Sequence, residues 1–103
     1  MDNSHYRYER RLDRRIPMGT AAIISLPGGN EIKAHCIELG VKGLTLRSTY
    51  VPSQNEQFEV RVYPPDGTNS GRPPFHALVE VKRCHAENHG DYVIGAAVVR
   101  VLG

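Results

Sequence analysis

Arginine side chains clustered near the N-terminus are the groups in this sequence best suited to specific chemistry. Residues 7–15 contain five arginines, and four of them fall in the stretch ERRLDRR, residues 9–15. A guanidinium is a planar fork of hydrogen-bond donors that matches phosphate oxygens and the O6/N7 edge of guanine. All three lysines lie elsewhere, although a merely solubilising tail would usually contain some. The segment therefore predicts recognition of a polyanion, with a solvated charged terminus as the alternative.

The excess positive charge of the protein is confined to this region. Residues 1–20 carry five arginines against three acidic side chains, whereas residues 21–103 carry eight basic and eight acidic ones. A nucleic-acid-binding barrel would usually have a basic body with interleaved aromatic residues, but only Tyr6 and Tyr8 accompany the arginines. We therefore expect no nucleic-acid partner.

Two glycines mark a second stretch, IELGVKGLTL, residues 37–46. Gly40 and Gly43 flank a tight connection between two apolar runs. Glycines in such a place allow a positive φ and let a ligand approach the backbone closely. An ordinary β-turn is the simpler alternative.

Catalytic and metal-binding patterns are poorly represented. The sequence has no phosphate loop of the GxxxxGK type. Cys84, His85 and His89 lie near one another in CHAENH, but strand alternation would put Cys84 and His85 on opposite faces. Their spacing matches none of the usual zinc patterns. We expect neither an enzyme nor a metal site.

Apolar alternation predicts about six strands and no long helix. Two runs in MGTAAIISLPGGNEIKAHCIEL (residues 18–39) are joined by the turn PGGN, and four more follow: KGLTLRST (42–49), QFEVRVY (57–63), FHALVEVKRCH (75–85) and YVIGAAVVRVL (92–102). In QFEVRVY, for example, Phe58, Val60 and Val62 share one face. This spacing predicts an all-β fold, a six-stranded antiparallel β-barrel, because closure removes exposed strand edges.

The domain organisation follows from the same pattern. Residues 1–15 lack apolar periodicity and predict a flexible arginine-rich N-terminal arm, followed by a single barrel domain over residues 16–103.

Cys36 and Cys84 lie in apolar stretches and are expected to be free thiols. The chain has neither the apolar run of a membrane helix nor a secretory signal, so we expect a cytoplasmic protein without membrane insertion.

Together these features resemble the PilZ domain family, bacterial receptors for the second messenger cyclic di-GMP. The family has a six-stranded barrel preceded by an RxxxR motif, often written ERRxxxR. In ERRLDRRIP, Arg11 and Arg15 match the motif and Arg10 precedes them. Arg10 and Arg14 also fit the spacing, but the following IP favours Arg11 and Arg15. The closing DYVIGAAVV looks like the family's last strand, with Gly95 at its glycine. The resemblance covers essentially the whole chain.

The second motif of the family, [D/N]xSxxG, is only partly kept. Anchored on Gly43, the six residues are ELGVKG, so Glu38 replaces Asp or Asn and Gly40 replaces Ser. The resemblance implies that the first side chain contacts guanine and the third position contacts a phosphate. Glu38 retains a carboxylate that can accept from guanine N1–H and N2–H, and the Gly40 N–H can replace the hydroxyl. One lost neutral hydrogen bond costs about 1 kcal/mol, so weakened binding is expected rather than none.

The resemblance implies a cyclic di-GMP receptor and adaptor. Arg11 and Arg15 would bind phosphates and the Hoogsteen edges of guanine, with Arg10 as an accessory. Lys42 and Arg83 are two further candidate cations for the ligand site. Charged side chains at strand ends are, however, more often in contact with water alone. The arm would wrap the nucleotide and change the surface shown to an unidentified effector protein. The alternative is a degenerate PilZ domain that binds no nucleotide and acts through protein contacts alone.

Overall fold

Six antiparallel strands form the part of the chain that the computed structural model describes, residues 15–65, 71–87 and 90–103. The strands are β1 (Arg15–Ser25), β2 (Glu31–Gly40), β3 (Gly43–Ser48), β4 (Gln57–Val62), β5 (Phe75–Ala86) and β6 (Tyr92–Val101). All six predicted strands are confirmed, and β1 begins at the last residue of the expected arm. The rest of that arm lies outside the described residues. No helix among the described segments has the length and hydropathy to cross a bilayer.

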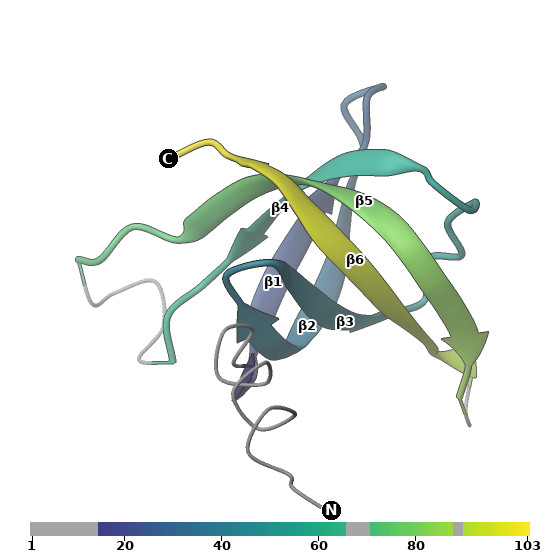
Figure 1. Cartoon of the computed structure of the whole chain (residues 1–103), viewed down its shortest axis with the longest axis horizontal. Helices are drawn as coiled ribbons and strands as arrows, with labels where there is room; N and C mark the ends of the chain where they lie inside the picture. Colours follow the sequence, from purple (N-terminus) through teal and green to yellow (C-terminus); the bar gives the residue numbers. More distant parts are fainter. Residues whose placement is uncertain (1–14, 66–70, 88–89) are drawn as a thin grey trace, which may run out of the picture.

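The strands close into a barrel in the order β1-β2-β3-β6-β5-β4, with β4 pairing back to β1 (Figure 1). Each pair of neighbours is antiparallel. The predicted six-stranded antiparallel barrel is therefore confirmed. Because every strand has two partners, each has backbone hydrogen bonds on both sides along its paired length.

The predicted PGGN turn joins β1 to β2. The Leu26 N–H donates to the carbonyl of Asn30, and the Gly29 N–H donates to the carbonyl of Leu26. In each bond the nitrogen and the oxygen are 2.9 Å apart. Gly29 has a φ of 97°. A side chain at this φ would crowd the backbone, so glycine is the residue that the turn requires. The turn lies at the end of β1 remote from Arg15 (Figure 1).

The core fills the inside of the barrel with side chains from all six strands. Phe58, Val60 and Val62 are at most 2% exposed, which confirms the predicted inward face of β4. Removing each large apolar side chain from water stabilises the fold by about 1.5–3 kcal/mol. The buried cluster comprises Ala22, Ile24, Ala34, Cys36, Leu44, Leu46, Phe58, Val60, Val62, Ala77, Val79, Val81, Ile94 and Ala96.

Candidate ligand-binding surface

One row of paired residues crosses five strands of the barrel. Pro17 of β1 pairs with Glu38 of β2, and Glu38 pairs with Thr45 of β3. Thr45 pairs with Gly95 of β6, and Gly95 pairs with Arg83 of β5. We call these five residues the site row. Neighbouring strands are about 4.8 Å apart, so three strand spacings, about 14 Å measured along the curved sheet, separate Glu38 from Arg83.

The site row lies on the outer surface of the barrel. Leu44 and Leu46, on either side of Thr45, are fully buried in the core. Because successive residues of a strand point to opposite faces, Thr45 points away from the core, although it is covered and only 6% exposed. Glu38 is half-buried and Arg83 is exposed, as expected for the same outer face.

A β-bulge directs Glu38 outward. Cys36 pairs with Leu46, but Glu38 pairs with Thr45, so Ile37 is an extra residue in β2. Simple alternation would place Glu38 on the same inward face as Cys36. The extra residue reverses the phase of the strand and moves the carboxylate to the surface.

Two further β-bulges lie beside the site row. In β5, Val81 pairs with Ala96 and Arg83 with Gly95, so Lys82 is the extra residue and Arg83 points outward. In β1 the register shifts between Pro17 and Thr20. Bulges of this kind commonly lie next to functional sites, where they re-aim side chains. Three bulges along one row therefore point to this surface.

Cys36 supports the β2 bulge from inside. Its thiol donates to the carbonyl of Glu38, with Sγ and O 3.2 Å apart. Burial raises the pKa of the Cys36 thiol to about 11, so it remains a neutral donor near pH 7. Cys36 and Cys84 are both free, which confirms the expectation from the sequence.

The β1–β2 register brings the two sequence motifs together. Arg15 pairs with Gly40, and two residues further on Pro17 pairs with Glu38. The end of ERRLDRR is therefore beside ELGVKG at one end of the barrel, where β1 begins and β2 ends (Figure 1). Arg10 and Arg11 lie outside the described residues.

Neither Gly40 nor Gly43 uses the positive φ that glycine allows. Gly43 is a buried residue of β3 that pairs with Ala97, and its turn is tied to β6 by a hydrogen bond of 2.8 Å from Val98 N–H to the Lys42 carbonyl. Regular pairing keeps such a glycine in ordinary backbone space. Among the described residues, the glycines with positive φ are Gly19, Gly29, Gly71 and Gly90.

Gly95 provides the surface on which Arg83 rests. A Cβ atom added to Gly95 would lie 2.7 Å from Cζ and 2.9 Å from Cγ of Arg83. The Arg83 side chain therefore reaches from β5 onto β6 and lies over Gly95. Any larger residue at position 95 would force the guanidinium to move.

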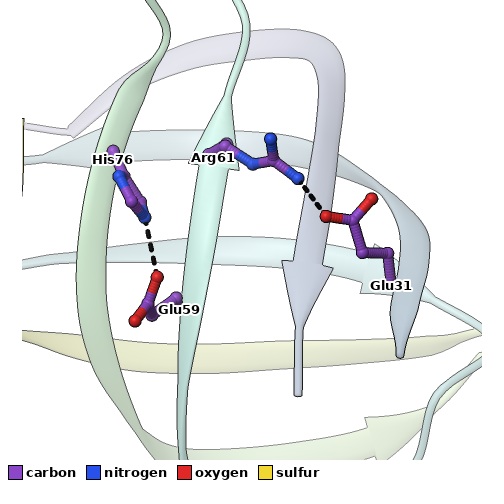
Figure 2. Close-up of polar contacts among 4 residues, drawn as sticks. All are labelled: Glu31, Glu59, Arg61 and His76. Carbon is purple, nitrogen blue, oxygen red and sulfur yellow. Dashed lines mark hydrogen bonds and ion pairs between the residues drawn. The ribbon is translucent and has the colours of Figure 1, made fainter. Parts of the chain in front are cut away.

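The wall formed by β5, β4, β1 and β2 has a different electrostatic character. His76 Nε2 lies 2.9 Å from a Glu59 oxygen, and Arg61 reaches over β1 to Glu31, with N and O 2.5 Å apart (Figure 2). Exposed pairs of this kind contribute only about 0–1 kcal/mol each. They do, however, occupy the Arg61 guanidinium, whereas Arg83 has no acidic partner within the described part of the chain.

The Cys–His stretch of the β5–β6 connection forms no recognisable metal centre in the described residues. No group of three or more His, Cys, Asp or Glu side chains there could hold a metal ion. Burial raises the pKa of the half-buried Cys84 thiol, which disfavours the thiolate that a metal would need. His89 lies outside the described residues.

The sequence did not indicate that Thr45 pairs between Glu38 and Gly95, or that the Arg83 side chain lies over Gly95. One signal was available. Glu38 and Arg83 each follow a buried apolar residue by two positions, where alternation alone would bury a charge. A charge at an inward position of a strand indicates a bulge, although it does not identify the residues across the sheet.

One solved structure supports the expected architecture. The chain is similar to the "PilZ domain with c-di-GMP of YcgR from Escherichia coli", with a TM-score of 0.59 and 13% sequence identity over 87% of this chain and 78% of that chain. No family model and no curated protein matches the sequence. The described barrel therefore has the fold of a PilZ domain.

Proposed function

We propose that this protein is a cyclic di-GMP receptor and adaptor of bacterial second-messenger signalling, without enzymatic activity and acting in the cytoplasm. The observation that carries the proposal is the β1–β2 register, which pairs Arg15 with Gly40 and Pro17 with Glu38. The two stretches selected from the sequence thus meet on a barrel whose structural neighbour was solved with cyclic di-GMP.

The chemistry of the ligand matches the residues available. Cyclic di-GMP has two phosphates and two guanines, and Arg10, Arg11 and Arg15 offer charge-assisted, bidentate donors to both kinds of group. Glu38 would accept hydrogen bonds from a guanine Watson–Crick edge, and the Gly40 N–H would meet a phosphate. The charge-assisted arginine contacts outweigh the one neutral hydrogen bond lost with the serine.

The output of the receptor would pass through a partner protein. In this proposal residues 1–15 wrap the nucleotide against the site row and change the surface that an effector meets. Val41 is 77% exposed and Val99 is 49% exposed. Each lies one residue from the hydrogen bond that ties Lys42 to Val98. Exposed apolar side chains beside the ligand surface are suited to a protein contact.

Isothermal titration of the full chain with cyclic di-GMP tests this function. Separate titrations with GTP and with cyclic di-AMP are the controls for selectivity. We expect selective, saturable binding. The Arg11→Ala/Arg15→Ala double variant should lose it, because two charge-assisted contacts of about 1.5–3 kcal/mol each disappear. Its thermal unfolding without ligand should stay close to that of the wild type.

The matched control is Arg61→Ala/Arg100→Ala, which removes the same charge from outside the site row and should bind normally. A double arm variant that binds as well as the wild type would refute the role of the arm. A wild-type chain that binds no cyclic di-GMP at millimolar concentration would favour the alternative, a degenerate domain acting through protein contacts.

A further inference from the structure

We propose that residues 99–101, which we call the free edge of β6, are a docking site for a partner protein. The partner adds an extended segment of alternating apolar and acidic residues to this edge as a further strand. The inference rests on the partner contact in the proposed function, not on the nucleotide, and it names the surface and the kind of segment that would meet there.

The end of β6 extends beyond the strand that covers one of its sides. On the β3 side, its last pair is Ala97 with Gly43. On the β5 side, the pairing continues to Val101, which is opposite Ala77. Within the described chain, residues 99–101 therefore have a neighbouring strand on one side only. An open edge of this kind is a template for pairing with another chain.

Val101 directs its backbone polar groups toward the open side. The Leu102 N–H donates to the His76 carbonyl over 2.7 Å, so these two residues form a hydrogen-bonded pair between β6 and β5. Hydrogen-bonded and non-hydrogen-bonded pairs alternate along antiparallel strands. The adjacent pair, Val101 with Ala77, is therefore a non-hydrogen-bonded one. Its Val101 N–H and carbonyl point away from β5, where an added strand can bond to them.

The side chain of Val101 lies on the core side of the sheet but is not covered. Directly paired residues share a face of the sheet, yet Ala77 is fully buried whereas Val101 is 57% exposed. Val99 in β6 and Val41 in the turn that bonds to β6 are exposed as well. Three of the four exposed large hydrophobic side chains of the described residues thus gather at this edge, as expected for a protein contact.

The charge of the edge favours an acidic partner. Arg100 and Lys42 are exposed and have no acidic partner in the described part of the chain. An added strand that alternates between apolar and acidic residues would place an apolar side chain beside Val101 and a carboxylate beside Arg100.

The same charge disfavours occupants from this chain. The antiparallel register that pairs Val99 with Val101 of a second copy also places the two Arg100 side chains opposite each other, and like charges there destabilise a sheet. Residues 7–15 carry five arginines against Glu9 and Asp13, so the N-terminal arm would add positive charge to a positive edge.

Nuclear magnetic resonance of the isotope-labelled full chain tests the inference with two short blocked peptides, one alternating valine with glutamate and one alternating valine with lysine. We expect the glutamate peptide to shift the amide signals of residues 99–101 saturably. It should also slow hydrogen exchange at the Val101 N–H severalfold, because that donor gains a partner. An unchanged exchange rate would overturn strand addition. Protection already present without peptide would identify the arm or a second copy as the occupant and overturn the proposal.

Arg100→Glu tests the charge of the partner. It should weaken binding of the glutamate peptide about fivefold and strengthen binding of the lysine peptide, because a cross-strand attraction becomes a repulsion. Lys33→Glu makes the same change of charge on β2, away from this edge, and should leave both affinities unchanged. Equal affinity of Arg100→Glu and the wild type for the glutamate peptide would overturn the acidic partner. So would a wild-type chain that does not bind this peptide at millimolar concentration.

Titration with cyclic di-GMP separates this inference from the receptor function. Arg100→Glu should bind the nucleotide like the wild type, since Arg100 lies outside the site row. A wild-type chain that binds the glutamate peptide but not the nucleotide would refute the receptor function and leave the docking edge in place.

Discussion

Glu38 and Arg83 occupy strand positions at which simple alternation would bury a charge. An unpaired ion inside this small core would cost several kcal/mol, a large share of the 5–15 kcal/mol that stabilises a typical domain. One extra residue before each of them, Ile37 and Lys82, avoids that cost. At the scale of single residues, therefore, the outer site and the inner core depend on the same two bulges.

Cys36 predicts a pH dependence of folding. Burial raises its pKa from 9.0 to about 11, so the unfolded chain loses this proton before the folded chain does. The resulting stabilisation is complete below pH 9 and is lost as the pH rises toward and through 11. It amounts to roughly 2–3 kcal/mol. The free energy of unfolding should therefore fall more steeply from pH 8 to 11 in the wild type than in Cys36→Ala, measured by urea denaturation.

The comparison concerns slopes, because Cys36→Ala also leaves a small cavity that lowers stability at every pH. Cys84→Ala is the control, since its thiol is half-exposed and should change the slope less. Equal slopes for wild type and Cys36→Ala would show that the buried thiol does not control the alkaline loss of stability.

At the scale of elements, turns and bulges fix the register that brings the motifs together. The β1–β2 hairpin sets which residues of the two strands meet, and the β1 bulge between Pro17 and Thr20 shifts that register by one residue before the motif. Gly19, within the bulge, has a φ of 63°. The pairing of Arg15 with Gly40 thus depends on local chemistry at both ends of the hairpin.

Two adjacent glycines test the hairpin. Gly29 has a φ of 97°, whereas Gly28 has no positive φ, and a Cβ on either residue meets nothing within 4 Å. Gly29→Ala should therefore destabilise the protein by about 1–2 kcal/mol, through backbone strain alone. Gly28→Ala should be neutral or slightly stabilising, because alanine restricts the unfolded chain. Equal midpoints of urea unfolding for the two variants would contradict the described turn.

At the scale of the whole molecule, the barrel closes with strands that begin at Arg15. Residues 21–103 are electrically balanced, and the excess charge belongs to residues 1–20. In the proposed function, anion recognition therefore falls mainly on residues 1–15, whereas the described barrel provides the stability. The barrel supplies a scaffold and the site row, and the arm supplies most of the charge.

Removal of residues 1–14 should separate these two properties. We expect the shortened chain to unfold cooperatively at nearly the wild-type temperature, because all six strands and the core cluster remain. Titration calorimetry should detect no binding of cyclic di-GMP. Wild-type affinity in the shortened chain would show that the arm is not needed, and loss of cooperative unfolding would show that it belongs to the fold.

The sequence by itself determined the strands, the inward faces and the two candidate motifs. Alternation at Phe58, Val60 and Val62 has a period of two, and PGGN is a local turn signal, so both are readable without knowledge of distant partners. The family resemblance, carried by ERRLDRR, ELGVKG and DYVIGAAVV, added the expectation of a six-stranded barrel behind an arginine motif, but not the order of its strands.

Only the tertiary structure decided which surface the motifs share. A bulge reverses the phase of a strand, and the register that reveals it is a relation between strands. Glu38 and Arg83 are 45 residues apart in sequence, yet they belong to one row because Thr45 and Gly95 pair between them. No local pattern encodes that pairing, since it depends on how six strands close around one core.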